Sequence, residues 1–95
     1  MTYAQRSLEA ASLMLKGEYQ AALDLYKRLA EEFPNMLGEC QAQMASMNFV
    51  LKNYDQALKL WEEALAHGIE NTKQVQDAVQ RTREALAKQA GGGRG

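Results

Sequence analysis

Hydrophobic residues recur along this chain at intervals of three and four, the spacing that gathers apolar side chains on one face of an α-helix. The pattern predicts five helices, over about residues 3–16, 18–33, 36–52, 54–67 and 72–90. Helix-forming residues such as Ala, Leu, Gln, Glu and Lys dominate, and β-branched residues are few. The expected fold class is therefore all-α.

Helix-breaking residues separate the predicted segments. Gly17 tolerates the positive φ with which many helices end, and Pro34 cannot donate a hydrogen bond into a helix. Gly68 followed by Ile69 predicts a Schellman-type stop. Polar residues before four helices are predicted as N-caps, three of them with a glutamine that can complete a capping box: Thr2 with Gln5, Asn35, Asn53 with Gln56, and Asn71 or Thr72 with Gln74.

Each predicted helix has an apolar face that is expected to point into the core. The first and third helices have narrow stripes, which are Ala4, Leu8, Ala11 and Leu15, and Cys40, Met44, Met47 and Leu51. The second and fourth have broader faces with aromatic residues: Tyr19, Ala22, Leu23, Tyr26, Leu29, Ala30 and Phe33, and Tyr54, Ala57, Leu58, Trp61, Ala64 and Leu65. The fifth is more polar, with Val75, Ala78, Val79, Thr82, Ala85 and Leu86 facing inward.

Part of this pattern occurs twice. Residues 17–30 are matched by residues 52–65, and every matched pair is 35 residues apart. Tyr26 is matched by Trp61, for example, and the pairs of small residues are Ala22 with Ala57 and Ala10 with Ala45. A fixed period of this length is typical of helical repeat arrays.

The repeated segments resemble the tetratricopeptide repeat family. The resemblance lies in the run Gly17-x-Tyr19-x-x-Ala22-x-x-x-Tyr26 followed by Pro34, and in Tyr54-x-x-Ala57-x-x-x-Trp61-x-x-Ala64. The chain departs from the family pattern where the first helix of each unit has a Trp, a position held here by Arg6 and Gln41. The resemblance implies a right-handed α-solenoid of antiparallel helix pairs.

One domain is expected over residues 1–90. It divides into repeat one at 3–36, repeat two at 37–70 and a capping helix at 71–90, while the Gly-rich tail at 91–95 is expected to be disordered.

Composition and charge narrow the function. The formal net charge of −1 offers no basic surface, so no nucleic-acid partner is expected. No apolar run reaches the length that spans a bilayer, and the N-terminus lacks the order of a signal peptide, so no membrane association is expected. The lone Cys40 excludes an internal disulfide and fits a reducing compartment. These features predict a cytoplasmic protein, and Met1 favours a complete chain.

No catalytic, metal-binding or cofactor-binding group is predicted. The only histidine, His67, lies in a last helical turn, where it favours the helix dipole. Cys40 lies in an apolar stripe without a histidine partner. Adjacent glutamates at 31–32 and 62–63 lie at polar helix ends. The chain is therefore expected not to be an enzyme.

The resemblance implies a concave groove lined by the first helix of each unit and by the cap. The positions carried over are Ser7, Ala11 and Met14 from unit one, Glu39, Ala42, Ser46, Phe49 and Val50 from unit two, and Lys73, Gln76 and Gln80 from the fifth helix. Of the family's clamp for a peptide carboxylate only Lys73 is matched, so that ligand is not expected. In an alternative interpretation, the fifth helix fills the groove, and Met14 and Phe49 are core residues.

Two functions remain open. The first is an adaptor that binds an apolar or helical segment of a partner protein in the concave groove. The second is a structural scaffold without a peptide ligand that self-associates through the Met-rich third helix or the outer face, because two and a half repeats are fewer than such arrays usually need.

Overall fold

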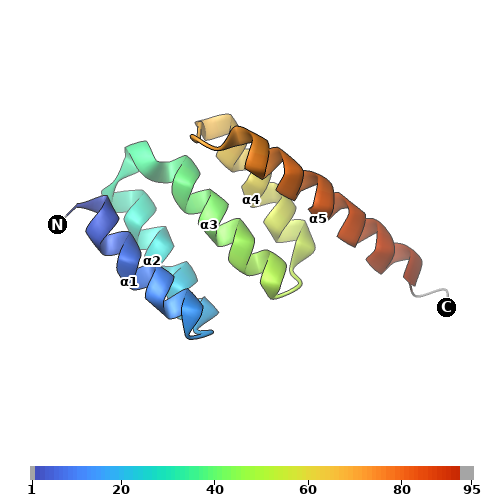
Figure 1. The fold of residues 1–95 in the computed structure, drawn as a ribbon, viewed down its shortest axis with the longest axis horizontal. Helices are drawn as coiled ribbons and strands as arrows, with labels where there is room; N and C mark the ends of the chain where they lie inside the picture. Colours follow the sequence, from blue (N-terminus) through green and yellow to red (C-terminus); the bar gives the residue numbers. More distant parts are fainter. Residues whose placement is uncertain (1, 93–95) are drawn as a thin grey trace.

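The computed structural model describes residues 2–92, in which all regular secondary structure is helical and there is no strand. Its elements are α1 (Tyr3–Leu15), α2 (Tyr19–Glu32), a 3-10 turn (Pro34–Met36), α3 (Leu37–Val50), α4 (Tyr54–His67) and α5 (Thr72–Gly92). The prediction of an all-α protein with five helices is confirmed. Each helix packs on the next one along the chain, and the most extensive contact joins α3 and α4. Figure 1 shows α1, α3 and α5 across one face, with α2 and α4 behind them.

The ends of α1 and α3 have the same hydrogen-bonded turn. After α1 the Gly17 N–H donates to the Met14 carbonyl (3.0 Å) and the Glu18 N–H to the Leu13 carbonyl (2.9 Å), the two bonds of a Schellman motif. Gly17 has a φ of 79°. The predicted role of Gly17 is confirmed, and the same pair of bonds recurs 35 residues later around Lys52.

The predicted caps are confirmed in part. Thr2 and Gln5 form the capping box, with N···O distances of 3.0 and 3.3 Å. Asn53 stands at the N-cap of α4, but its side chain accepts no hydrogen bond from the helix, and its amide donates to Asn48 Oδ1 (3.4 Å), so no box with Gln56 forms. The prediction of Asn35 as a cap is wrong, because Pro34 starts a 3-10 turn that includes Asn35 and delays the helix.

The end of α4 differs from the Schellman motif that the sequence predicts. Gly68 has a φ of 90°, and its N–H makes one bond, to the Ala64 carbonyl (3.1 Å). Ile69 is half-buried and packs against the core. The backbone of Gly68 lies against Gly38 of α3, where a Cβ atom would overlap with the Gly68 carbonyl oxygen. The turn at Gly68 therefore lies where the end of α4 closely approaches α3.

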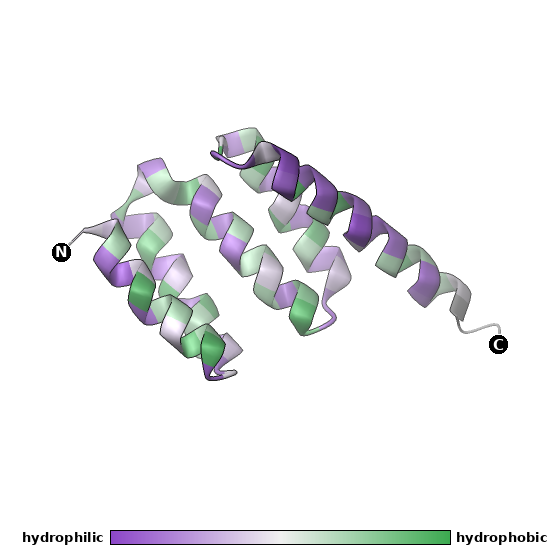
Figure 2. Cartoon of the chain, in the orientation of Figure 1, coloured by the Kyte–Doolittle hydropathy of each residue, from purple (hydrophilic) through white to green (hydrophobic). Residues whose placement is uncertain are grey.

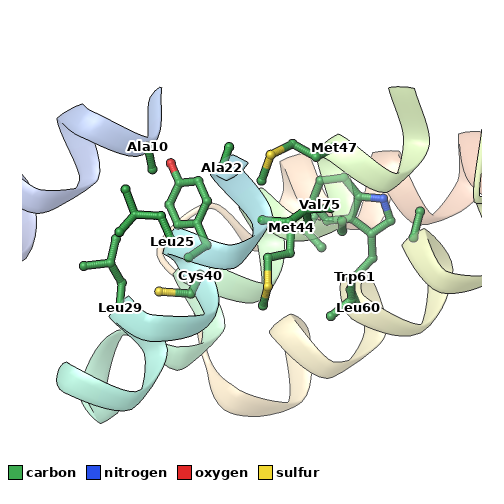
Figure 3. Packing of buried hydrophobic residues seen from close by; sticks show 14 of the residues in the cluster. Ala10, Ala22, Leu25, Leu29, Cys40, Met44, Met47, Leu60, Trp61 and Val75 are labelled. Carbon is green, nitrogen blue, oxygen red and sulfur yellow. The ribbon is translucent and has the colours of Figure 1, made fainter. Parts of the chain in front are cut away.

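The residues of the 35-residue repeat form the core (Figure 3). Ala10, Ala45, Ala22 and Ala57 are fully buried, so the paired helices meet at alanines. Other buried residues fill the space beside these contacts and are Leu23, Leu25, Tyr26, Leu29, Cys40, Met44, Met47, Leu60, Trp61, Val75 and Val79. The repeat thus marks equivalent packing positions.

The predicted apolar stripe of α1 is not buried. Leu8 is 70% exposed and Leu15 is 90% exposed, while the buried residue of this helix is Ala10. The reason is the position of α1 at the end of the array, where it packs chiefly on α2 and has no helix on its other side. Leu51 of the third stripe is likewise 42% exposed, at the end of its helix.

Helix α5 packs chiefly on α4. Its buried residues, Val75, Val79 and Thr82, follow Cys40, Met44 and Met47 by 35 residues, so α5 uses the contact face of α3. All six residues of its predicted inward face are buried or half-buried. At the position of Ala10 and Ala45 it has the exposed Gln80, because no helix follows to cover it.

The prediction of a disordered tail is wrong for residues 91 and 92, which belong to α5, and residues 93–95 lie outside the described range. Among the described residues, no helix is long and apolar enough to cross a bilayer.

Candidate peptide-binding cleft

An open cleft of about 400 Å³ lies between α3 and α5. Helix α3 contributes all five of the positions that the sequence places in the groove on this helix, and α5 forms the opposite wall. The lining residues are Glu39, Ala42, Gln43, Ser46, Phe49 and Val50 of α3, Trp61 of α4, Ile69 and Asn71 of the connection, and Gln74, Val75, Ala78 and Arg81 of α5. The fifth helix therefore borders this space and does not fill it.

The floor of the cleft is apolar and fixed by packing. Trp61 reaches it from α4, and Val75 is buried beside it. Phe49 is half-buried and meets Tyr54 edge to face, with ring centroids 5.2 Å apart. Small side chains at Ala42 and Ala78 leave the space between the walls open. A ligand would therefore meet an apolar surface that does not need to rearrange.

The rim of the cleft is polar and carries two opposite charges. Glu39 lies in the first turn of α3 and accepts a hydrogen bond from the Glu70 N–H (3.2 Å). Arg81 lies in the third turn of α5, is exposed, and forms no salt bridge within residues 2–92. Because α3 and α5 run in the same direction (Figure 1), the two charges lie toward opposite ends of the cleft.

Trp61 is the only residue of the described chain with a buried side-chain polar atom that lacks a hydrogen bond, its Nε1. The side chain is only 8% exposed. A buried N–H without an acceptor is costly, so such a donor is informative where it occurs beside a cavity. Trp61 also lines the cleft, while its Nε1 is itself buried.

Six of the predicted groove residues do not line this cleft. Ser7, Ala11 and Met14 of α1 are half-buried on the far side of α3, and Met14 packs against the core, as the alternative interpretation expects. Lys73, Gln76 and Gln80 of α5 are exposed and point elsewhere. The wall of α5 consists instead of Gln74, Val75, Ala78 and Arg81.

The predicted positions on α5 and its cleft wall differ by one residue of register. Lys73 follows Glu39 by 34 residues, whereas the buried residues of α5 follow those of α3 by 35. One residue turns a helix by about 100°, which is enough to move a side chain off the wall. A period of 35 residues would predict Gln74 and Arg81 as the cleft-lining positions of α5, which they are. The repeat in the sequence therefore contained this information.

The groups considered for chemistry lie apart from the cleft. Cys40 is buried, its thiol donates to the Tyr3 hydroxyl (3.8 Å), and burial raises the pKa of this thiol. His67 Nδ1 lies 2.8 Å from Oε1 of the buried Gln41, a contact that the sequence did not predict. No cluster of three or more possible metal ligands occurs among the described residues.

Comparison with protein-family models, with curated proteins and with solved structures finds no match for this chain. The functional interpretation therefore rests on its own repeat and cleft.

Proposed function

We propose that the chain is a tetratricopeptide-type module, a short right-handed α-solenoid with repeats at 3–36 and 37–70 and a capping helix from 71. It holds an apolar or helical segment of a partner protein in the cleft between α3 and α5. The observation that carries this proposal is that the cleft is open and is lined by Glu39, Ala42, Ser46, Phe49 and Val50, the positions at which the family resemblance implies ligand contact.

The dimensions and chemistry of the cleft favour a peptide segment. A volume of about 400 Å³ lies within the range of ligand sites, which is about 300–1,000 Å³. An apolar floor between two roughly parallel helices fits side chains at positions i, i+3, i+4 and i+7 of a third helix. The charges at Glu39 and Arg81 would set the direction of that helix through its dipole. The proposed role is therefore binding without catalysis.

Localisation in the cytoplasm is part of the proposal. It is supported by the single cysteine, which is buried and reduced, and by the ordinary charge of the chain.

The proposal is tested with a panel of synthetic amphipathic helical peptides and the fluorescence of Trp61, the only tryptophan of the chain and part of the cleft floor. Ala42→Arg fills the cleft from the wall of α3, so peptides that change the emission of the wild type are expected to lose at least about tenfold in affinity. Ala66→Arg, on an exposed position of α4, is the matched control and retains affinity.

Circular dichroism of both variants checks that the helices remain intact. If no peptide of the panel changes Trp61 emission, or if Ala42→Arg binds as tightly as Ala66→Arg, the cleft is not the binding site.

A further inference from the structure

The apolar stripe of α1 has no partner within the described chain. Ala4, Leu8, Ala11 and Leu15 lie along one side of the helix at intervals of four, three and four residues. Leu8 and Leu15 are the two most exposed large hydrophobic residues of the molecule, at 70% and 90%. Two leucines that share one helix face with two alanines form a knob-like surface of the kind that packs into a groove.

The stripe and the cleft lie on the same face of the molecule. The stripe precedes four residues of the α3 wall of the cleft by 35 positions, namely Glu39, Gln43, Ser46 and Val50. Figure 1 shows α1, α3 and α5 across one face, and the ribbon in Figure 2 has hydrophobic segments in α1 and at the end of α3. The same face thus carries the exposed apolar stripe of α1 and the open apolar cleft between α3 and α5.

We propose that the cleft between α3 and α5 accepts α1 of a second copy of this chain. The inference rests on the proposed use of the cleft for a helical segment, and it names that segment. A helix of 13 residues is about 20 Å long, which matches the 14-residue wall of α3. Leu8 and Leu15 are two turns apart and would fill the space that Ala42 and Ala78 leave open.

Charge complementarity supports this occupant. Helix α1 has no acidic residue in its first turn, so the positive end of its dipole has no carboxylate of its own, whereas Lys16 stands at its C-cap. A helix that enters the cleft parallel to α3 brings its N-terminal end to Glu39 and its C-terminal end to Arg81. The carboxylate of Glu39 then faces the positive end of the dipole, and this end of the cleft carries the charge complementarity.

A two-fold axis produces this orientation. An axis parallel to α3, in the plane between two such faces, brings α1 of each copy over the cleft of the other and keeps the helices parallel. Every contact then occurs twice, as in other isologous dimers. The doubling matters because one short helix in a cleft is small beside the roughly 1,200 Å² that stable interfaces bury.

The test is analytical ultracentrifugation of two variants, alone and mixed. Leu8→Lys with Leu15→Lys removes the stripe at exposed positions, and Ala42→Arg blocks the cleft. The wild type is expected to be a dimer at about 50 μM, and each variant alone a monomer. An equimolar mixture of the two keeps one of the two contacts, between the intact cleft of one and the intact stripe of the other, and is expected to associate more weakly than the wild type. Ala66→Arg remains dimeric.

Three results would overturn the proposal. They are a monomeric wild type at about 200 μM, a stripe variant that still dimerises, and a cleft variant that still dimerises. The last result would indicate pairing of stripe with stripe.

The stripe variant separates failure of this inference from failure of the proposed function, because no α1 helix occupies its cleft. If a synthetic peptide of residues 2–16 leaves its Trp61 emission unchanged while other helical peptides change it, the cleft binds helices but not α1. If no peptide changes the Trp61 emission, the proposed function itself is wrong.

Discussion

Gly17 and Lys52 occupy the same position in two successive turns and share a left-handed backbone, with φ of 79° and 66°. The carbonyl acceptors are equivalent in both turns, which lie 35 residues apart. Glycine adopts this conformation without strain, whereas a residue with a Cβ atom is sterically strained in it. The second repeat thus makes with a lysine the same turn that the first repeat makes with a glycine.

Lys52→Gly is therefore expected to raise the free energy of unfolding by about 1 kcal/mol, because strain is relieved and no described contact of the side chain is lost. Lys27→Gly, at an exposed position inside α2, is the matched control and is expected to lower it by about 1 kcal/mol. Urea unfolding followed by circular dichroism measures both. The same sign for both variants would contradict the role assigned to the turn.

Gly38→Ala is expected to destabilise the protein by about 1–3 kcal/mol. The new methyl group would overlap with the Gly68 carbonyl oxygen and touch Ile69, so α3 and the end of α4 would have to separate. Gly91→Ala is the control, because its Cβ atom meets nothing within 4 Å and alanine is the better helix former. A Gly38→Ala variant as stable as the wild type would show that this close approach is not needed.

Stability is expected to fall as the pH rises above about 9. Burial raises the pKa of Tyr3, Tyr26 and Cys40 in the folded chain. The unfolded chain releases these protons first, at about 8.5 for cysteine and 10 for tyrosine, so alkaline pH favours unfolding. The free energy of unfolding at pH 7, 9 and 10.5 measures the effect. Cys40→Ala is expected to shift the onset to higher pH, and a flat profile would contradict the prediction.

Helix α5 is expected to open before α3, because α5 packs chiefly on one neighbour, whereas α3 packs on two. Val79→Ala removes a residue from this contact and is expected to cost about 2 kcal/mol. Hydrogen exchange should then speed up in α5 and little in α3. An exchange rate that rises equally in both helices would mean that the chain opens as one unit.

Much of the fold could be predicted from the sequence. The range of α4 matches the expected range, and the other helices differ by a few residues at their ends. The alanines that recur at 35 residues are the fully buried contact points. These features are local or periodic, since side-chain spacing, Gly17 and Pro34 act within a few residues of themselves.

The site could be predicted only in its central part. The positions on α3 line the cleft because this helix has neighbours on both sides, as the repeat pattern assumes. The expectations failed at the two ends of the array, for Leu8 and Leu15 of α1 and for Lys73 and Gln76 of α5. A residue's apolar character does not reveal whether another helix is present to cover it.

The sequence by itself determined the helices, their stops and the positions at which paired helices meet, because hydrogen bonding and side-chain periodicity are properties of the local chain. Only the tertiary structure decided that the stripe of α1 stays in solvent, that Lys52 adopts the turn of a glycine, and that α5 leaves a cleft beside α3. These outcomes depend on which surfaces remain without a neighbour once the chain has packed, and burial is a property of the whole arrangement.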